Sequence, residues 1–458
     1  MRVVFQDCRW GDHSWVLRVL LLPVVLGVLL GGPVLASAAN FFLSQSGGGA
    51  GTSCASPSAI SFFNTAGNWA NPKQVGKIGP GDTVFLCGTI TSSLTLQNSG
   101  SSGSPVTVDG TSATMGAAIG VHTNETSWWV LQHLHWADQP TTPPFEIVGG
   151  GNGIVDDAFA DNLDDFALMY FQGNVQRPDT MTLKNSFFRT RAFNYGQTEH
   201  DLVRSEGALN VTIEGNYLEM RAQGQGGSAH DDVIQCYETG STGTHGPNVN
   251  WTIRYNRLVM NSASSPNDRS WLMMERLTGT NYVYGNVFVG LQGGEDANGA
   301  VFESIAGSTY NIYNNTFVAK SGSNNTVGAG VGTGTMNITN NIVYTASGQT
   351  ALATGPGTFN RSFNHWFGTN IPSCAGIPGE VCGTDPSFTD YANNDFTLQS
   401  GSIDKGAGTN AGAPYTTGIV PGTTWPAPAL VSRSVPWDRG AYVSSTSGVA
   451  PTILRIIR

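Results

Sequence analysis

The feature that most constrains the fold is a short pattern, apolar-x-x-Asn-x-apolar, that recurs through the middle of the chain. Its copies centre on seven asparagines, Asn185, Asn216, Asn256, Asn286, Asn315, Asn341 and Asn364. Successive copies lie 31, 40, 30, 29, 26 and 23 residues apart, and a degenerate copy without Asn covers residues 130–136. Periods of roughly 20 to 50 residues are typical of solenoids, so the sequence predicts a stack of similar coils.

The residues around each Asn indicate which kind of solenoid forms. Apolar and polar residues alternate on both sides of the Asn, which is typical of strands with one buried face. Asn tolerates the left-handed backbone of a tight turn, and stacked amides can bond to backbone in neighbouring coils. Leucine-rich repeats would show Leu at fixed offsets, and a propeller would need a hairpin in each blade. We therefore predict an all-β, single-stranded right-handed parallel β-helix with an Asn ladder and an N-terminal cap.

Composition excludes several other classes of protein. The chain of 458 residues contains 59 Gly and only 12 % charged residues, against about 25 % in an ordinary globular domain. Its 22 Lys and Arg face 32 Asp and Glu, a formal net charge of −10 that excludes a general nucleic-acid binder. Gly, Asn, Ser and Thr disfavour helix interiors, while 40 % hydrophobic residues argue against disorder.

The first 38 residues are typical of a secretory signal peptide. Positive charge from Arg2, Arg9 and Arg18 precedes an apolar run at 19–30, and small residues at 36–38 form a cleavage site. The run is shorter than the ~20 residues that a membrane-spanning helix needs. An uncleaved anchor is the alternative. We expect a secreted, extracellular protein with no membrane association after cleavage.

Six cysteines are consistent with an oxidising compartment. Cys8 leaves with the signal peptide. Cys374 and Cys382 bracket a Pro- and Gly-rich loop suited to a short disulfide, and Cys54–Cys87 is the second expected pair. Cys236 is then left over in an apolar-alternating stretch, where a buried thiol behaves as a small hydrophobe. No Cys-x-x-Cys or His-x-x-x-His spacing occurs, so a zinc site is not indicated.

Three regions of the chain resemble the pectate-lyase-like superfamily of secreted right-handed parallel β-helix proteins. They are the entry segment and first coil, the Asn ladder, and a closing module, which cover residues 40–49 with 78–110, 185–364, and 385–404 with 437–442. We expect the cap and first coils over 39–110, the helix body over 111–370, the closing module over 371–445 and a tail over 446–458. This fold hosts lyases, hydrolases, epimerases and adhesins, so the resemblance implies architecture more than chemistry.

Stacked coils place equivalent side chains about 4.8 Å apart on one wall, which suits an extended polymer. The strand before each Asn-bearing strand carries the charges of an otherwise charge-poor chain. Aligned on the following turn, these strands place four positions on neighbouring rungs: Arg204, Gln235, Glu275 or Arg276, and Glu303. Long insertions at 221–230, 238–250 and 261–270 adjoin this wall. We predict the functional groove there.

Within that wall, His230, Asp231 and Asp232 are candidates for acid and base, because neighbouring carboxylates push their pKa values apart. The alternative is a loop corner in which Asp231 caps a turn and His230 is solvated. An adjacent Asp pair followed by His245-Gly246 resembles polygalacturonases, although their Asn-Thr-Asp element is absent from this sequence.

The resemblance to the lyase members implies an Arg or Lys that removes the proton α to a uronate carboxylate. Arg204, Arg276 or His230 would be the base or charge neutraliser, with Glu275 or Asp232 as an orienting residue or metal ligand. Arg recognises carboxylates through two parallel hydrogen bonds, which favours an acidic glycan. The alternative is that the arginines pair with Glu206 and Glu275. The remaining substrate-binding candidates are His200, Asp201, Gln235, Tyr237, Arg269, Trp271 and Glu303.

Calcium is the one cofactor that the sequence raises. Asp161, Asp164 and Asp165 crowd one loop and could offer oxygen ligands, with a solvated loop as the alternative. Taken together, the sequence predicts a monomeric polysaccharide lyase that acts on a uronate-containing glycan by β-elimination. A glycoside hydrolase with paired carboxylates and a non-catalytic adhesin or surface repeat protein are the other two hypotheses.

Overall fold

The computed structural model describes twelve stretches of the chain: 37–163, 167–172, 176–192, 200–221, 231–237, 246–261, 269–292, 299–304, 307–320, 325–329, 333–346 and 348–444. The predicted signal peptide lies almost wholly outside these residues. Among the described residues, no helix is both long and apolar enough to cross a membrane.

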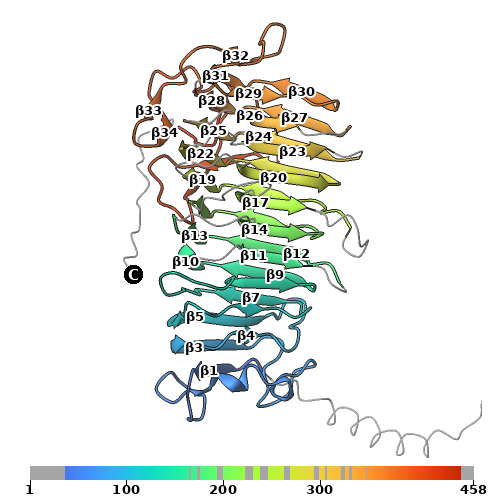
Figure 1. Cartoon of the computed structure of the whole chain (residues 1–458), viewed down its shortest axis with the longest axis vertical. Coiled ribbons are helices and arrows are strands. Elements are labelled where there is room, and N and C mark those ends of the chain that lie inside the picture. The colour runs from blue at the N-terminus through green and yellow to red at the C-terminus, as the bar shows by residue number, and fades with distance from the viewer. Residues whose placement is uncertain are drawn as a thin grey trace, which may run out of the picture. The chain divides into compact units, whose positions relative to one another are not determined.

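Three stacks of parallel strands build the structure, and we call them sheets 1, 2 and 3 (Figure 1). Each coil of the middle region contributes one strand to each sheet in the order 2, 3, 1. Sheet 2 has the strand order β2 (Ser58–Ala59), β1 (Asn40–Ser44), β3 (Thr83–Ile90), β5 (Val106–Met115), β7 (Trp129–Gln132), β9 (Gly151–Asp156), β12 (Asp179–Lys184), β15 (Thr212–Glu214), β18 (Thr252–Arg254), β21 (Thr280–Tyr284), β24 (Thr309–Tyr313), β27 (Thr335–Thr339) and β30 (Thr358–Ser362).

The other two sheets follow the same progression. Sheet 3 comprises β10 (Phe159–Leu163), β13 (Phe187–Thr190), β16 (Tyr217–Met220), β19 (Arg257–Asn261), β22 (Val287–Gln292), β25 (Thr316–Ala319), β28 (Ile342–Thr345), β31 (His365–Gly368) and β32 (Val381–Cys382). Sheet 1 comprises β4 (Leu94–Thr95), β6 (Val121–His122), β8 (Phe145–Val148), β11 (Ala167–Gln172), β14 (His200–Glu206), β17 (Asp231–Tyr237), β20 (Arg269–Leu277), β23 (Ala300–Ser304), β26 (Asn325–Ala329) and β29 (Thr350–Ala353). The predicted right-handed parallel β-helix is confirmed.

Short elements complete the two ends. Near the N-terminal end lie two 3₁₀ turns, η1 (Ile60–Phe62) and η2 (Ala66–Asn68). Beyond the last coil, the closing segment forms two antiparallel hairpins, β33 (Phe388–Asp390) with β34 (Asp395–Leu398) and β35 (Thr417–Ile419) with β36 (Leu430–Ser432).

A ladder of six buried asparagines runs through the turn between sheets 2 and 3, at Asn216, Asn256, Asn286, Asn315, Asn341 and Asn364. From Asn256 onward, each side-chain oxygen accepts hydrogen bonds from the backbone N–H and the side-chain amide of the asparagine one coil before it, at 2.9–3.0 Å. Each amide also donates to a backbone carbonyl, as Asn256 does to Ile213. The predicted ladder is thus confirmed, and it satisfies polar groups that would otherwise be buried without partners.

The prediction was wrong by one residue at the first copy. Phe187 pairs with Tyr217, so Ser186 and not Asn185 aligns with Asn216, and the Ser186 N–H donates to the Asn216 side-chain oxygen at 2.9 Å. Asn185 instead takes the left-handed turn position, with φ 53°. In the other coils the residue before the ladder asparagine has the positive φ, so hydrogen bonding rather than turn geometry selects Asn in the ladder.

The interior is filled by apolar side chains from all three sheets. Phe288 and Phe317 are fully buried and stack with ring centroids 4.4 Å apart. Phe187 differs, because it is only half-buried and stacks on Phe159, which is 37 % exposed, and on Tyr217. A second row of aromatics therefore lies on the outer side of sheet 3.

Both predicted disulfides, Cys54–Cys87 and Cys374–Cys382, are present, and Cys236 is free and buried as expected. Two disulfides indicate an oxidising compartment. Burial raises the pKa of the Cys236 thiol well above its usual value, and the charge of Glu275 adds to this. The thiol therefore stays protonated and packs as a small apolar group.

The Cys54–Cys87 bridge ties the entry segment to strand β3 across 33 residues of chain. Replacing both cysteines with serine is expected to lower the free energy of unfolding by about 2–4 kcal/mol, because the unfolded chain regains the entropy of an open loop. Urea denaturation of the double variant measures this. The bridge at Cys374 closes a separation of only 8 residues, so its removal should cost less, and the opposite ranking would contradict the argument.

Candidate functional site

The predicted wall lies on sheet 1, where β14, β17 and β20 run side by side (Figure 1). The strand register aligns Asp201 with Asp232, and Arg204 with Gln235. Adjacent strands lie about 4.8 Å apart, so each pair of aligned side chains shares one column of the wall. These four residues come from parts of the sequence some 30 residues apart, and only the coil register brings them together.

A break in the alternation of inward and outward side chains brings the Asp201–Asp232 column and the Arg204–Gln235 column onto one face of the sheet. Side chains normally alternate between the two faces of a strand, but Leu202 and Val203 both belong to the apolar core. The residues on either side of this pair, Asp201 and Arg204, therefore face the same way. Their ion pair confirms this, with Arg204 Nη1 3.9 Å from Asp201 Oδ2.

The same break recurs in the next two strands. Val233 with Ile234, and Trp271 with Leu272, are consecutive residues that both pack in the core. The outer face of these strands consequently carries an acidic column, Asp201 and Asp232, parallel to a column that begins with Arg204. The sequence could have predicted these two columns only if the pair of consecutive apolar residues in each of the three strands had been recognised as the same break in alternation.

The polar groups of this wall are held in place and largely shielded from water. Asp201 and Asp232 are 2 % and 0 % exposed, and the Arg204 side chain is 16 % exposed. The Asp232 N–H donates to Asp201 Oδ1 at 3.1 Å, which links the two strands. A guanidinium beside a buried carboxylate is a group suited to fix the carboxylate of a bound ligand.

Several predicted positions turned out differently. Trp271 is 2 % exposed, donates its indole N–H to the Val289 carbonyl at 3.2 Å and packs on Phe288 and Phe317. Trp271 is therefore a core residue and not the substrate-binding residue that the sequence predicted. Asp231 and Asp232 are both fully buried, and the register aligns Asp232 with Asp201 and with Ser270.

The predicted alignment of Arg204 and Gln235 with Glu275 or Arg276 and with Glu303 does not continue beyond Gln235. Gln235 aligns with Met273, and Met273 aligns with Val301, so Glu275 lies two residues beyond this column. Counting back from the following turn could not detect the pairing of β17 with β20, and a shift between Met274 and Leu277 also interrupts the pairing of β20 with β23. His230 lies outside the described residues, as do the side chains of five further candidates, His200, Tyr237, Arg269, Arg276 and Glu303.

The residues proposed for calcium do not assemble a site in the described part of the chain. Asp161 accepts two hydrogen bonds from Arg189, at 2.7 and 2.6 Å. Burial alone would raise the pKa of Asp161, but these bonds and the Arg189 charge outweigh it and lower the pKa. Asp164 and Asp165 lie outside the described residues. No cluster of three or more His, Cys, Asp or Glu able to hold a metal occurs among the described residues.

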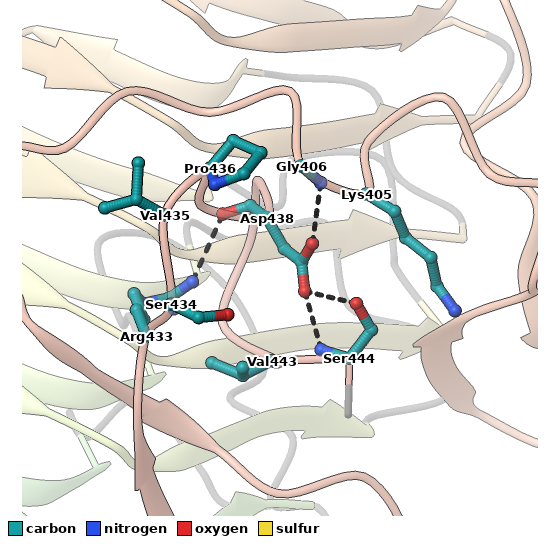
Figure 2. Close-up of a pocket in the computed structure, with 9 residues that line it drawn as sticks. All are labelled: Lys405, Gly406, Arg433, Ser434, Val435, Pro436, Asp438, Val443 and Ser444. Atoms are coloured by element: carbon teal, nitrogen blue, oxygen red, sulfur yellow. Dashed lines mark hydrogen bonds between the residues drawn. The ribbon is translucent and has the colours of Figure 1, made fainter. Parts of the chain in front are cut away.

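A cavity of about 310 Å³ lies in the closing segment (Figure 2). Arg433 lines it and donates to four backbone carbonyls, those of Thr417, Asp438, Gly440 and Ala441. Burial lowers the pKa of Arg433 to about 10. The Asp438 carboxylate accepts the Gly406 N–H and both the N–H and hydroxyl of Ser444. These charged groups hold loops together, which is a structural task.

Among known proteins, similarity to this chain is found only in solved structures. No family model matches the sequence, and no curated protein matches it. The structure is similar to pectate lyase Pel9A, with a TM-score of 0.47 and 11 % identity over 90 % of this chain and 98 % of that one. It is also similar to XylC, solved in complex with xylose, with a TM-score of 0.43 and 9 % identity over 75 % and 82 % of the two chains. A mannuronic acid specific family 6 polysaccharide lyase from human gut microbiota gives a TM-score of 0.28 and 10 % identity over 76 % and 92 %.

Proposed function

We propose that this chain is a secreted polysaccharide lyase that cleaves a uronate-containing glycan by β-elimination on the outer face of sheet 1. The observation that carries the proposal is the pair of columns in which Arg204 stands beside Asp201, with Asp232 and Gln235 on the next rung. A wall of stacked strands offers an extended polymer repeated contacts, and Arg204 offers the positive charge that an acidic sugar needs.

Each proposed role follows from the surroundings of the residue. Arg204 forms an ion pair with Asp201, which holds its guanidinium in position to bind and neutralise the substrate carboxylate, and we assign proton removal to another residue. The base is then His230 or Arg276. It takes the proton α to the carboxylate, the C–H electron pair forms a carbon–carbon double bond, and the glycosidic C–O bond breaks. The departing oxygen takes a proton, and charge at the carboxylate is stabilised by Arg204 throughout.

A panel of acidic and neutral polysaccharides tests this proposal. We expect ultraviolet absorbance from an unsaturated product with at least one uronate-containing polymer, such as polygalacturonate or alginate, and none with neutral glucans or xylans. Assays with and without added calcium, and with a chelator, establish whether the metal is needed. Cleavage without absorbance would contradict the lyase mechanism, and binding without cleavage would favour an adhesin.

A glycoside hydrolase is the second candidate, and the alignment of Asp201 with Asp232 favours it. Two carboxyl groups on neighbouring rungs resemble the carboxyl pair of glycosidases. The pair is an acid and a nucleophile about 5–5.5 Å apart in retaining enzymes, and an acid and a base ~6.5–9.5 Å apart in inverting ones. New reducing ends without an unsaturated product would identify this activity. Loss of those reducing ends in Asp232→Asn would place the carboxylate in the reaction.

A further inference from the structure

A groove of about 300 Å³ lies on the outer face of sheet 2, away from the wall on sheet 1. It spans strands β7, β9 and β12 and the turn before β5, which stack in succession in Figure 1. Its lining residues are Gly103, Pro105, Trp128, Trp129, Val130, Asn152, Ile154, Thr180 and Thr182. All nine are uncharged, in contrast to the acidic and basic columns of sheet 1.

The lining combines an aromatic surface with neutral polar groups. Trp128, Val130 and Ile154 are half-buried, so their apolar surface is partly open to solvent. Thr180 donates its hydroxyl to Asp179 Oδ1 at 3.0 Å, and its oxygen can accept a further hydrogen bond. An aromatic face flanked by hydroxyl and amide groups suits a ligand with one apolar face and several hydroxyls.

Backbone strain is concentrated at this groove. Trp128, Asn152 and Thr180 have φ values of 59°, 56° and 55°, and the strand register places them at equivalent positions of three successive coils. Further along the same column, Asn210 and Asn250 also have positive φ, and Asn is well suited to that conformation. The bulky Trp128 and the β-branched Thr180 are poorly suited to a positive φ. Both occur where this column of residues borders the groove. Strain of this kind, held at one surface site, points to function.

We propose that this groove binds a neutral sugar of a polysaccharide, with the pyranose ring stacked on the Trp128 indole and its hydroxyls bonded to Asn152, Thr180 and Thr182. The uncharged lining complements an uncharged sugar and would not compensate the charge of a uronate. The site adds neutral glycan binding to the chain and does not depend on the chemistry proposed for sheet 1.

Trp128→Asn is the informative variant, since Asn removes the indole and relieves the strained backbone. Isothermal titration with cellohexaose, xylohexaose and mannohexaose is expected to show binding of at least one to the unaltered chain. The variant should bind it roughly tenfold more weakly or worse, because one aromatic stacking contact is lost. Its melting temperature should be equal or higher, which separates lost binding from lost folding.

The remaining outcomes each decide the proposal. Failure of all three neutral hexasaccharides to bind, equal binding by Trp128→Asn, or binding of oligogalacturonate alone would overturn it. So would dimers in sedimentation that disappear in Trp128→Asn, since the groove would then bind a second copy of the chain. Arg204→Ala should keep the neutral binding, so that failure of the lyase proposal and failure of this one are distinguishable.

Discussion

Replacement of Asn256 by alanine is expected to lower the free energy of unfolding by about 3–5 kcal/mol. Asn256 lies in the middle of the ladder, where its oxygen accepts two hydrogen bonds from Asn216 and its amide donates to Ile213 and Asn286. Alanine would leave these buried groups without their partners, at about 1–3 kcal/mol for each unsatisfied group. Urea denaturation followed by circular dichroism measures the loss.

Asn360 provides the matched control. It belongs to a second row of asparagines on the outer face of sheet 2, where it is exposed and donates to Asn337 at 2.9 Å. Asn360→Ala should change the free energy of unfolding by no more than about 0.5 kcal/mol, as surface substitutions usually do. Equal losses in Asn256→Ala and Asn360→Ala would show that the ladder contributes no more than surface hydrogen bonds.

Replacement of Arg204 by alanine is expected to reduce kcat/KM on the cleaved uronate polymer by about 100- to 1,000-fold, the usual effect of removing one group that stabilises transition-state charge. Since we propose that this charge develops on the substrate carboxylate, the loss should appear in kcat as well as in KM. Initial rates of unsaturated product formation over a range of polymer concentrations separate the two constants.

Arg254→Ala is the control for general effects of removing an arginine. Arg254 lies on sheet 2, where it pairs with Glu214 and donates to the Tyr284 hydroxyl, away from the proposed wall. Full activity in Arg254→Ala, together with an unchanged melting temperature in Arg204→Ala, would assign the loss to the wall. Unimpaired cleavage by Arg204→Ala would remove Arg204 from the mechanism.

The architecture was predictable because its causes repeat along the sequence. Each coil contains its own alternating strands and its own Asn, so six of the seven predicted asparagines, Asn216 to Asn364, fall in the ladder. The disulfides were predictable for a related reason, since they join cysteines that are 33 and 8 residues apart in the same end regions of the fold.

The composition of the proposed wall depended on register, which no local pattern specifies. Asp201, Arg204, Asp232 and Gln235 were singled out from the sequence, but Trp271 proved to be core and Glu275 lies two residues beyond the column. Two consecutive core residues follow Asp201, and two follow Asp232, so the usual alternation of inward and outward side chains is interrupted there. A shift of one residue in the pairing exchanges the two faces of a strand.

The sequence by itself therefore determined the coil, its ladder and its two bridges, because each of these rests on residues that recur or lie close together in the chain. Only the tertiary structure decided which side chains share a face, that Ser186 replaces Asn185 in the ladder, and that Trp128 borders a groove. The physical reason is that side-chain direction in a strand reverses at every residue, so a site built across coils depends on pairing between segments that are distant in sequence.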